Sequence, residues 1–335
     1  MTTFSDRAAP SVPQVDPKSP RPRYAALDVG TNSIRLLVVE ARPDGRLEPL
    51  LRLGESCRLG EGLDARGVIS GDAENRAART LVRFVRRARS MGPRAMRVAA
   101  THALRSASNG LEVAGRLSRA IGAPLEILSA EEEARYVYEA ARAALGSERL
   151  PEPCLVMDIG GGSVELVRGN EGQVEAWQSL DVGCVRLTER FLGSDPPVDG
   201  DLGRLREHVD DGLDSHPELY PLLAGGAGVG GTLTALAALD LRLERYEASR
   251  VEGHRLSRGA IDEWGARLAT LSTPEREALA AVGTGRADII VAGCVVVSAV
   301  LARSGLADIV VSTQGLRYAI ARRLAAADPA SEAFA

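Results

Sequence analysis

Short apolar runs separated by glycine turns begin abruptly at residue 24 of this chain. Residues 24–29 and 33–40 form two such runs on either side of a Gly-Thr-Asn turn, and together they predict a β-hairpin. A third strand is expected over 47–53. Apolar residues then recur at helical spacing over 70–91, which predicts an amphipathic helix. The next elements expected are a strand, a helix and a strand, at 96–101, 111–121 and 125–128.

The second half of the chain repeats the opening hairpin. An Asp-Val-Gly-Thr-Asn-Ser run at 28–33 aligns with Asp-Ile-Gly-Gly-Gly-Ser at 158–163, an offset of 158 minus 28, or 130 residues. Each copy places an aspartate at the end of an apolar strand, then a glycine turn, then a hydroxyl residue entering the next strand. This internal repeat predicts a duplicated α/β architecture with one hairpin in each half.

The rest of the chain alternates strands and helices. A capping box at Ser129 should open a helix that runs to about residue 145. A glycine-rich turn is expected at 225–231, directly before a helix at 232–239. The other expected elements are strands at 154–159, 163–168, 174–180 and 308–312, and helices at 185–191, 202–213, 288–303 and 316–325. This order suits mixed sheets that are covered by helices on both faces.

Composition and charge exclude several classes of function. Lys18 is the only lysine, against 40 arginines. A P-loop, a protein kinase and a Schiff-base enzyme each need a lysine at a fixed place, so these classes are excluded. The net charge of -4 gives no overall electrostatic reason to expect a nucleic acid or an anionic membrane as the partner.

The ends of the chain and its cysteines indicate a cytoplasmic protein. Residues 1–23 hold five of the 17 prolines and no apolar period, which is typical of a disordered tail, and 328–335 is expected to be a second tail. No stretch offers the roughly 20 apolar residues that a membrane-spanning helix needs. The cysteines lie far apart without metal-ligand spacing, so we expect reduced, buried thiols (Cys57, Cys154, Cys184 and Cys294).

The glycine turns are the strongest candidates for chemistry. Successive backbone N–H groups in such turns can hold phosphate oxygens without any side chain. The aspartates Asp28 and Asp158 that precede two of the turns suit a hard cation, because Mg²⁺ takes one or two carboxylates and completes its shell with water and phosphate. The alternative is structural, since an aspartate before glycine often makes only an Asx turn.

Three further features have both a structural and a functional interpretation. On local grounds, Glu131, Glu132 and Glu133 are explained by the helix macrodipole and the capping box. Arg105 could bind phosphate bidentately, although a solvated arginine is the commoner outcome. The Gly230-Gly231-Thr232 run could hold phosphate at a helix N-terminus.

Eight short motifs occur in a fixed order along the chain. They are Ala-Leu-Asp-Val-Gly-Thr-Asn-Ser at 26–33, Gly-Glu-Gly-Leu at 60–63, Thr-His-Ala-Leu-Arg at 101–105, Glu-Glu-Glu-Ala-Arg at 131–135, Met-Asp-Ile-Gly-Gly-Gly-Ser-Val-Glu at 157–165, Gly-Cys-Val at 183–185, Gly-Gly-Thr at 230–232 and Gly-Arg-Ala-Asp-Ile-Ile at 285–290. With these motifs in this order, the chain resembles the exopolyphosphatase and guanosine pentaphosphate phosphatase family, within the actin, Hsp70 and sugar-kinase superfamily.

The resemblance implies a fold and a domain organisation. It implies an α/β protein made of two actin-like, ribonuclease H-like domains with a cleft between them. These domains would cover 24–130 and 131–315, with the last helix at 316–327 packing back onto the first. The chain is similar to the short form of the family, which has no added C-terminal helical domain.

The resemblance also implies the roles of individual residues. Glu133 would be the catalytic residue that orients or deprotonates water, and Glu165 a second essential glutamate. Asp158, together with Asp28, would bind Mg²⁺ or Mn²⁺. The phosphate site would be formed by Gly30, Thr31, Asn32, Ser33, Arg105, Gly160, Gly161, Gly162, Ser163, Gly230, Gly231 and Thr232. The implied reaction is in-line attack of water on a terminal phosphorus, without a phosphoenzyme.

The resemblance leaves two substrates open. The first is inorganic polyphosphate and the alternative is guanosine pentaphosphate, while a non-catalytic polyphosphate or nucleotide sensor is an alternative of another class. A polyphosphate chain would need a long binding groove, and a homodimer is one way to provide it.

The sequence departs from the family near its C-terminus. The family usually has Gly-Leu-Arg-Glu-Gly there, whereas this chain has Tyr318 and Ala319 in place of the last two residues.

Overall fold

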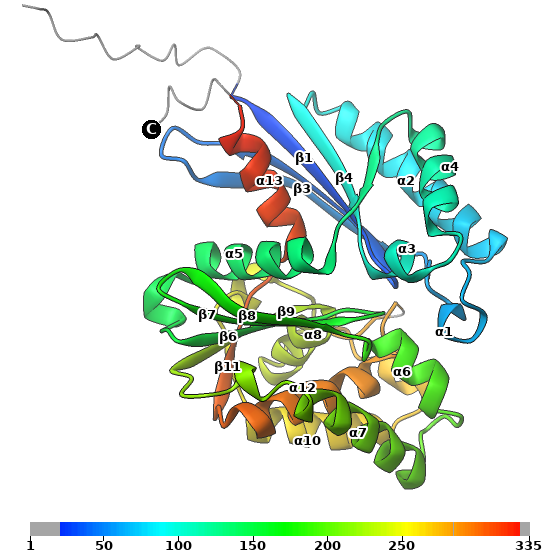
Figure 1. The fold of residues 1–335 in the computed structure, drawn as a ribbon, viewed down its shortest axis with the longest axis vertical. Coiled ribbons are helices and arrows are strands. Elements are labelled where there is room, and N and C mark those ends of the chain that lie inside the picture. The colour runs from blue at the N-terminus through cyan, green and yellow to red at the C-terminus, as the bar shows by residue number, and fades with distance from the viewer. Residues whose placement is uncertain (1–20, 284, 329–335) are drawn as a thin grey trace, which may run out of the picture.

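The protein contains two mixed β-sheets with helices around and between them (Figure 1). The computed structural model describes residues 21–283 and 285–328, so the tails expected at 1–23 and 328–335 lie mostly outside the described residues. In the described part of the chain, no helix combines the length and the apolar character needed to cross a bilayer.

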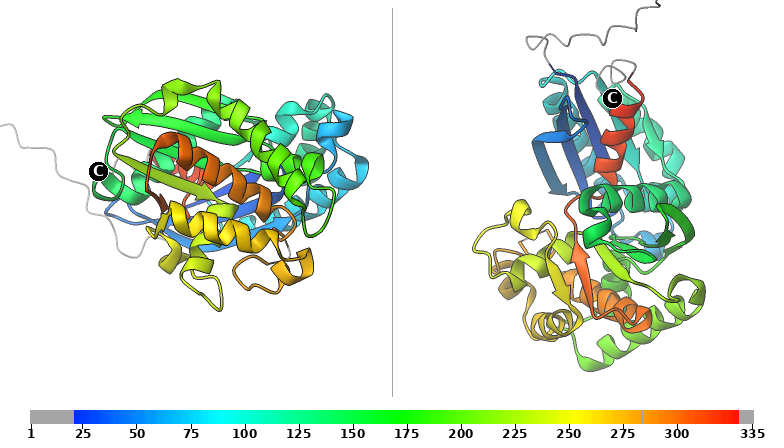
Figure 2. Two further views of the ribbon diagram at one scale, coloured as in Figure 1. Left: turned by 90° about the horizontal axis from the view of Figure 1, so that it is seen from below. Right: turned by 90° about the vertical axis from the view of Figure 1, so that its left-hand side faces the viewer.

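The first sheet has the strand order β3-β2-β1-β4-β5. Its strands are β1 (Arg23–Val29), β2 (Ser33–Ala41), β3 (Leu47–Ser56), β4 (Ala95–Ala100) and β5 (Leu125–Ile127). The hairpin partners β1, β2 and β3 are antiparallel, while β4 and β5 continue the sheet parallel to β1. Helices α2 (Gly71–Arg89) and α4 (Gly110–Ile121) cover one face. Helix α13 (Leu316–Ala326) packs on β1 and β2 at the other face (Figure 2).

The second sheet repeats this arrangement with one added strand. Its order is β10-β11-β9-β6-β7-β8. The hairpin β6–β7 and its neighbour β8 correspond to β1–β2 and β3, while β9 and β11 run parallel to β6 as β4 and β5 do to β1. The strands are β6 (Cys154–Ile159), β7 (Val164–Asn170), β8 (Gln173–Leu180), β9 (Gly225–Gly230), β10 (Arg255–Ser257) and β11 (Asp308–Val311). The predicted α/β class with a duplicated, hairpin-led mixed sheet is confirmed.

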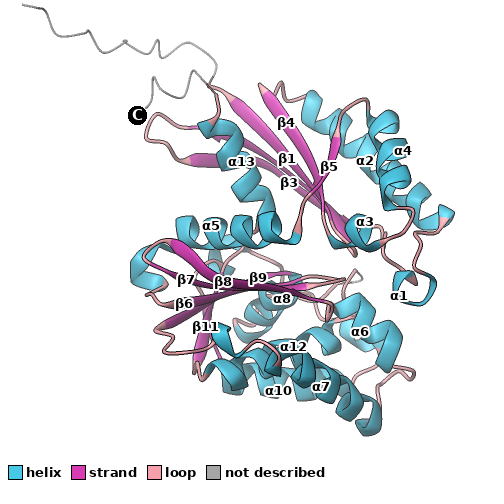
Figure 3. Ribbon diagram, viewed as in Figure 1, coloured by secondary structure: helices cyan, strands magenta, loops and turns pink. Residues whose placement is uncertain are grey.

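The outer face of the second sheet carries the largest core of the protein. Its helices are α6 (Cys184–Phe191), α7 (Asp199–Asp214), α8 (Gly231–Asp240), α10 (Arg258–Ala269) and α12 (Ile290–Ser304), which Figure 3 shows below the strands. The sequence pattern did not predict α10. It also missed β10 and several short elements: α1 (Leu63–Arg66), α3 (His102–Ser106), η1 (Pro217–Leu219), α9 (Ala248–Val251) and α11 (Thr273–Glu277).

One helix lies between the two sheets. Helix α5 (Ala130–Arg149) packs Tyr136 and Ala140 against the first sheet, whereas Val137 and Ala141 pack against the second. Residues three to four apart share one side of a helix, and the two pairs are offset by one residue, so they lie on two sides of α5 about 100° apart. The first turn of this helix is therefore held where the two sheets meet.

The turn expected at 225–231 is wrong, because most of this segment is the buried strand β9. Its glycines leave room for large apolar neighbours instead of forming a turn. A Cβ on Gly226 would lie 2.6 Å from Leu306 Cδ1, and one on Gly228 would lie 2.4 Å from Leu233 Cδ1. Only Gly230, with a φ of 97°, adopts a conformation that favours glycine for backbone reasons.

The C-terminal helix is fixed to the first sheet by a buried hydrogen bond. Tyr24 Oη on β1 donates to Asp328 Oδ2 over 2.8 Å, and Arg94 Nε lies 2.9 Å from the same oxygen. We expect Tyr24→Phe to lower the free energy of unfolding by about 1–3 kcal/mol, because the ring remains packed and only the hydroxyl is lost. Urea unfolding of both proteins measures the difference. A double-mutant cycle with Asp328→Ala that gives no coupling energy would contradict this assignment.

Candidate active site

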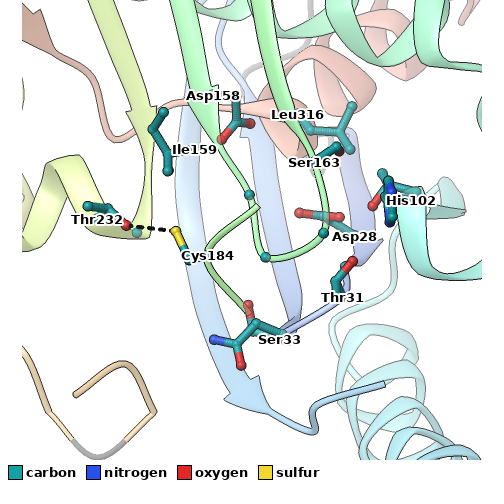
Figure 4. Close-up of a pocket in the computed structure, with 18 of the residues that line it drawn as sticks. Asp28, Thr31, Ser33, His102, Asp158, Ile159, Ser163, Cys184, Thr232 and Leu316 are labelled. Carbon is teal, nitrogen blue, oxygen red and sulfur yellow. Dashed lines mark hydrogen bonds between the residues drawn. The ribbon is translucent and has the colours of Figure 1, made fainter. Parts of the chain in front are cut away.

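The two glycine hairpins meet at one cavity between the sheets. Gly30 N donates to Ser33 O over 3.0 Å and Gly160 N donates to Ser163 O over 3.1 Å, so both copies form the same turn. The turns also touch each other, since a Cβ on Gly161 would lie only 3.1 Å from Asn32 N. Figure 4 shows Asp28 and Asp158 approaching this pocket from the two halves of the chain.

The structure brings nearly all of the predicted site residues to this cavity. The carboxyls of Asp28, Asp158, Glu133 and Glu165 line it, although they come from four different elements. All three predicted glycine segments line it too, as Gly30, Thr31, Asn32, Ser33, Gly160, Gly161, Gly162, Ser163, Gly230, Gly231 and Thr232. The arrangement on which the predicted chemistry depends, two aspartate loops and Glu133 around one space, is therefore present.

The predicted capping box explains the position of Glu133. Glu132 N donates to Ser129 Oγ over 3.1 Å, and Glu132 Oε2 accepts from Ser129 N over 2.9 Å, so the capping box is confirmed. Because Glu132 is engaged in the cap, the next residue turns into the cavity, where Glu133 is 7% exposed. Helix packing thus presents one carboxyl of the acidic first turn to the site.

Arg105 differs from the other predicted phosphate ligands. Its Nη1 donates to Glu133 Oε2 over 2.7 Å and to Leu128 O over 3.1 Å, and it does not line the cavity as Glu133 does. The structure shows Arg105 as the partner that fixes the Glu133 carboxyl. Direct contact of Arg105 with phosphate stays a prediction.

Glu165 is held by hydroxyl groups. Its Oε1 accepts from Ser163 Oγ over 2.6 Å and from Ser179 Oγ over 2.9 Å, and the residue is 1% exposed. In the hairpin register Glu165 lies opposite Asp158. The two carboxyls therefore occupy one face of the β6–β7 hairpin.

The register reveals a second repeat that the sequence reasoning missed. Arg35 lies opposite Asp28 in the β1–β2 hairpin, just as Glu165 lies opposite Asp158 in β6–β7. The same offset of 130 residues relates the two pairs, since 165 minus 35 is 130. One hairpin thus carries an acid–base pair and the other carries two acids, so the two halves of the cavity differ in charge.

Burial among other carboxyls raises the pKa of each acid in the site. Desolvation, followed by the charge of Glu165, raises the pKa of Glu133 well above its ordinary value, although Arg105 opposes the shift. Desolvation, followed by Glu165, raises the pKa of Asp158 to about 7. The pKa values of Asp28 and Glu165 are also raised, in both cases mainly by desolvation. Such a cluster favours a bound cation or protons.

Several residues that the sequence reasoning did not assign also line the cavity. Arg286 belongs to the Gly-Arg-Ala-Asp motif, and that motif was the one signal pointing to it. Desolvation, followed by repulsion from Arg35, lowers the pKa of Arg286 to about 10. His102 is buried, and its Nε2 lies 2.8 Å from Oδ1 of Asp181, which follows strand β8 in the second half of the chain. Cys184 Sγ lies 3.6 Å from Thr232 Oγ1.

The donor set suits one kind of metal site. Across residues 21–283 and 285–328, no three His, Cys, Asp or Glu side chains are grouped as a metal centre would need. Zinc sites built only from side chains require such groups. Magnesium does not, because it binds through one or two carboxylates together with water and substrate phosphates. Asp28 and Asp158 provide two such carboxylates. Their pKa values are raised by burial, and a bound cation would lower them again.

Comparisons with known proteins agree with this geometry. The sequence profile of the Ppx/GppA phosphatase family matches residues 37–324. The chain is 34% identical over 317 residues to exopolyphosphatase 2 of Mycobacterium tuberculosis, covering 90% of this chain and 98% of that protein. The crystal structure of an exopolyphosphatase-like protein matches with a TM-score of 0.85 and 31% identity, over 91% of this chain and 98% of its own. The Aquifex aeolicus member of the Ppx/GppA family matches with a TM-score of 0.76 and 30% identity, over 91% of this chain and 98% of its own.

Because burial raises the pKa of Asp158, the ionised carboxylate of this residue lowers the stability of the folded protein. Below the unfolded-state pKa of about 4 the carboxyl is protonated in both states, and stability is lost as the pH rises toward about 7. We therefore expect Asp158→Asn to raise the free energy of unfolding by about 4 kcal/mol at pH 8, with the gain shrinking as the pH falls to about 4.

Urea unfolding at several pH values, in a buffer with chelator and without phosphate, measures this gain. The matched control is Asp44→Asn, which changes a carboxylate on the surface whose pKa is lowered rather than raised. A gain from Asp158→Asn that is equal at pH 5 and pH 8 would be inconsistent with the titration of this carboxyl.

Proposed function

This chain belongs to the Ppx/GppA phosphatase family, and we propose that it is an exopolyphosphatase, which hydrolyses the terminal phosphoanhydride bond of inorganic polyphosphate and releases orthophosphate. One observation carries the proposal. Glu133, fixed by Arg105, shares a cavity with two facing glycine turns and the aspartates that precede them. A water-activating carboxyl is thereby placed beside groups suited to hold a phosphate.

The glycine turns are suited to bind the terminal phosphate. Gly161 and Gly162 lie against the first hairpin turn, where Cβ atoms would clash with Asn32 and Thr31. The absence of side chains at these glycines lets the two turns pack together at the cavity. Successive backbone N–H groups in such turns can hold phosphate oxygens, and Arg286 adds positive charge at the same cavity. Charge that develops on the transferring phosphoryl group is the main quantity such a site must stabilise.

Glu133 is proposed to orient and deprotonate the attacking water. Its carboxyl has a fixed direction because Arg105 donates to one oxygen. Its raised pKa makes it a stronger base than an ordinary glutamate and keeps it able to accept a proton near neutral pH. Glu165 contributes by raising the pKa of Glu133 through its charge, and the proton taken from water would remain within this buried pair.

Asp158 and Asp28 are proposed to hold Mg²⁺ or Mn²⁺. A bound divalent cation would neutralise phosphate charge and offset the repulsion among the acids. Desolvation raises the pKa of both aspartates, and Arg35, opposite Asp28, opposes this rise and so favours their ionised, metal-binding form. We propose that the protein acts in the cytoplasm, on a substrate that carries many phosphates.

The catalytic role of Glu133 predicts a large loss of activity when its charge is removed. Glu133→Gln should lower kcat for phosphate release by about 10²–10⁴-fold, with KM changed far less, because general base catalysis contributes about that much. Steady-state measurement of released phosphate tests this. Glu132→Gln is the matched control on the same helical turn, and it should weaken the cap while leaving kcat nearly intact. Equal activity of wild type and Glu133→Gln would exclude the role.

The raised pKa of Glu133 predicts a pH profile displaced toward neutrality. Because the base must be ionised, kcat/KM should rise with pH over a range well above 4.5, the ordinary value for glutamate. Rates measured between pH 5 and pH 9 at constant ionic strength check this. A profile already flat from pH 5 upward would contradict the shifted base.

A direct comparison of substrates tests the proposed reaction. Guanosine pentaphosphate contains the same type of terminal phosphoanhydride bond, so both compounds should be given to the purified protein with Mg²⁺. We expect kcat/KM for long-chain polyphosphate to be the larger. Phosphate release only from the nucleotide would replace the proposed substrate, and tight binding of either compound without release would indicate a sensor.

A further inference from the structure

A second cavity adjoins the one already described. Its volume is about 580 Å³, and it lies between strand β3, the start of α13 and the loops around α9 and α11. The two cavities share wall residues, namely Asp28, Arg35, Asp158, Gly230, Arg286 and Leu316. A molecule held at the glycine turns could therefore continue into this space.

Positive charge dominates the second cavity. Four arginines line it, Arg35, Arg52, Arg286 and Arg317, whereas its carboxyls are only the two shared aspartates. Among the residues that the structure describes, none of the four guanidiniums forms an ion pair. Desolvation, followed by repulsion from Arg35, lowers the pKa of Arg317 to about 10, as it does that of Arg286. Asp28 is the acid on which the charges of Arg35 and Arg317 act, and four arginines against two carboxyls leave an excess of positive charge in the cavity. Such an excess is typical of a binding site for an anion with several charges.

Tyr318 holds two of these arginines without cancelling their charge. Arg52 Nε donates to Tyr318 Oη over 2.7 Å. The guanidinium carbons of Arg52 and Arg317 lie 6.0 Å and 5.9 Å from the centre of the Tyr318 ring, within the range of cation–π attraction. The tyrosine is 2% exposed, so it is a fixed support. A glutamate at this position would instead neutralise Arg52.

Apart from the arginines and the two shared aspartates, the polar side chains in the walls of the cavity are hydroxyls only, those of Thr234, Ser312, Thr313 and half-exposed Tyr246. The remaining side chains that line it include the small or apolar Ala248, Ala280, Ala281 and Val282. Four guanidiniums match a run of charged phosphates better than they match one neutral nucleoside. The chemistry therefore favours a linear phosphate chain as the occupant.

We propose that the second cavity is a subsite for the phosphates next to the terminal one, and that Arg52, supported by neutral Tyr318, determines the affinity for longer chains. This inference rests on the proposed function, because the terminal phosphate is taken to lie at the glycine turns. Arg52 acts only in binding, since it lies on β3 and does not line the cavity that contains Glu133. A chain too short to leave the first cavity should not depend on it.

The first test separates binding from chemistry. Arg52→Gln should raise KM for long-chain polyphosphate about tenfold while kcat changes less than twofold, because one charge-assisted contact is lost far from the reacting bond. Arg52 is exposed to solvent at the cavity, so the variant should fold normally. Arg52→Lys should recover part of the affinity. An unchanged KM, or a fall in kcat alone, would overturn the proposal.

The second test uses Tyr318, where two substitutions should act in opposite ways. Tyr318→Phe keeps the ring and leaves Arg52 charged, so KM should stay within about twofold of wild type. Tyr318→Glu places a carboxylate beside Arg52, so KM should rise as it does in Arg52→Gln. Thermal unfolding checks that both variants are folded. Equal KM values for the two folded variants would overturn the role of the neutral partner.

Calorimetric binding keeps this inference separate from the proposed function. In the Glu133→Gln background, long-chain polyphosphate and guanosine pentaphosphate are titrated into proteins with and without Arg52→Gln, with orthophosphate as the short ligand. We expect Arg52→Gln to weaken polyphosphate binding about tenfold and to leave orthophosphate binding unchanged. This result would support the subsite even if wild-type protein released no phosphate. Equal weakening for orthophosphate, or weakening for the nucleotide alone, would overturn it.

Discussion

The packing of α5 between the two sheets is the constraint on which the site depends. One side of this helix contributes Tyr136 and Ala140 to the core of the first sheet, and a neighbouring side contributes Val137 and Ala141 to the core of the second. Sliding or tilting the helix would disturb both cores, so its first turn has little freedom. Glu133 stands in that turn, and its direction is set by Arg105 from the first half of the chain. Glu133, which we propose activates water, is thus positioned by the contact between the halves.

The same contact forces like charges together. Glu133, Glu165, Asp158 and Asp28 line one cavity, and desolvation raises the pKa of each. A protein selected only for stability would not retain such a cluster, because buried like charges oppose folding. Around the acids lie glycine turns and Arg35 and Arg286, which offer the opposite charge to a phosphate. This combination suits a site where a metal phosphate is bound and a nearby carboxylate must stay basic.

The duplicated hairpin divides these tasks between its copies. Asp28 faces Arg35 in the first hairpin, while Asp158 faces Glu165 in the second. Asp28 and Arg35 of the first hairpin therefore line the second cavity together with its other arginines. Glu165 of the second hairpin lines the first cavity together with Glu133. Arg35 and Glu165 occupy equivalent positions in the two hairpins, so the cavity that contains Glu133 has a basic side chain from one hairpin and an acidic side chain from the other.

The sequence by itself determined the elements and motifs that depend on neighbours in the chain. The two hairpins follow from alternating apolar runs and glycine turns, and the capping box at Ser129 fixed the start of α5. The tertiary structure alone decided the rest. Glycines at 225–230 form a buried strand because Leu233 and Leu306 fill the space beside them. The arginines of the second cavity, Arg35, Arg52, Arg286 and Arg317, come from distant segments, and only Arg286, through its motif, was distinguished in the sequence from the other arginines of the chain. Which side chains share a cavity is set by sheet register and helix packing, and these act between residues far apart in sequence.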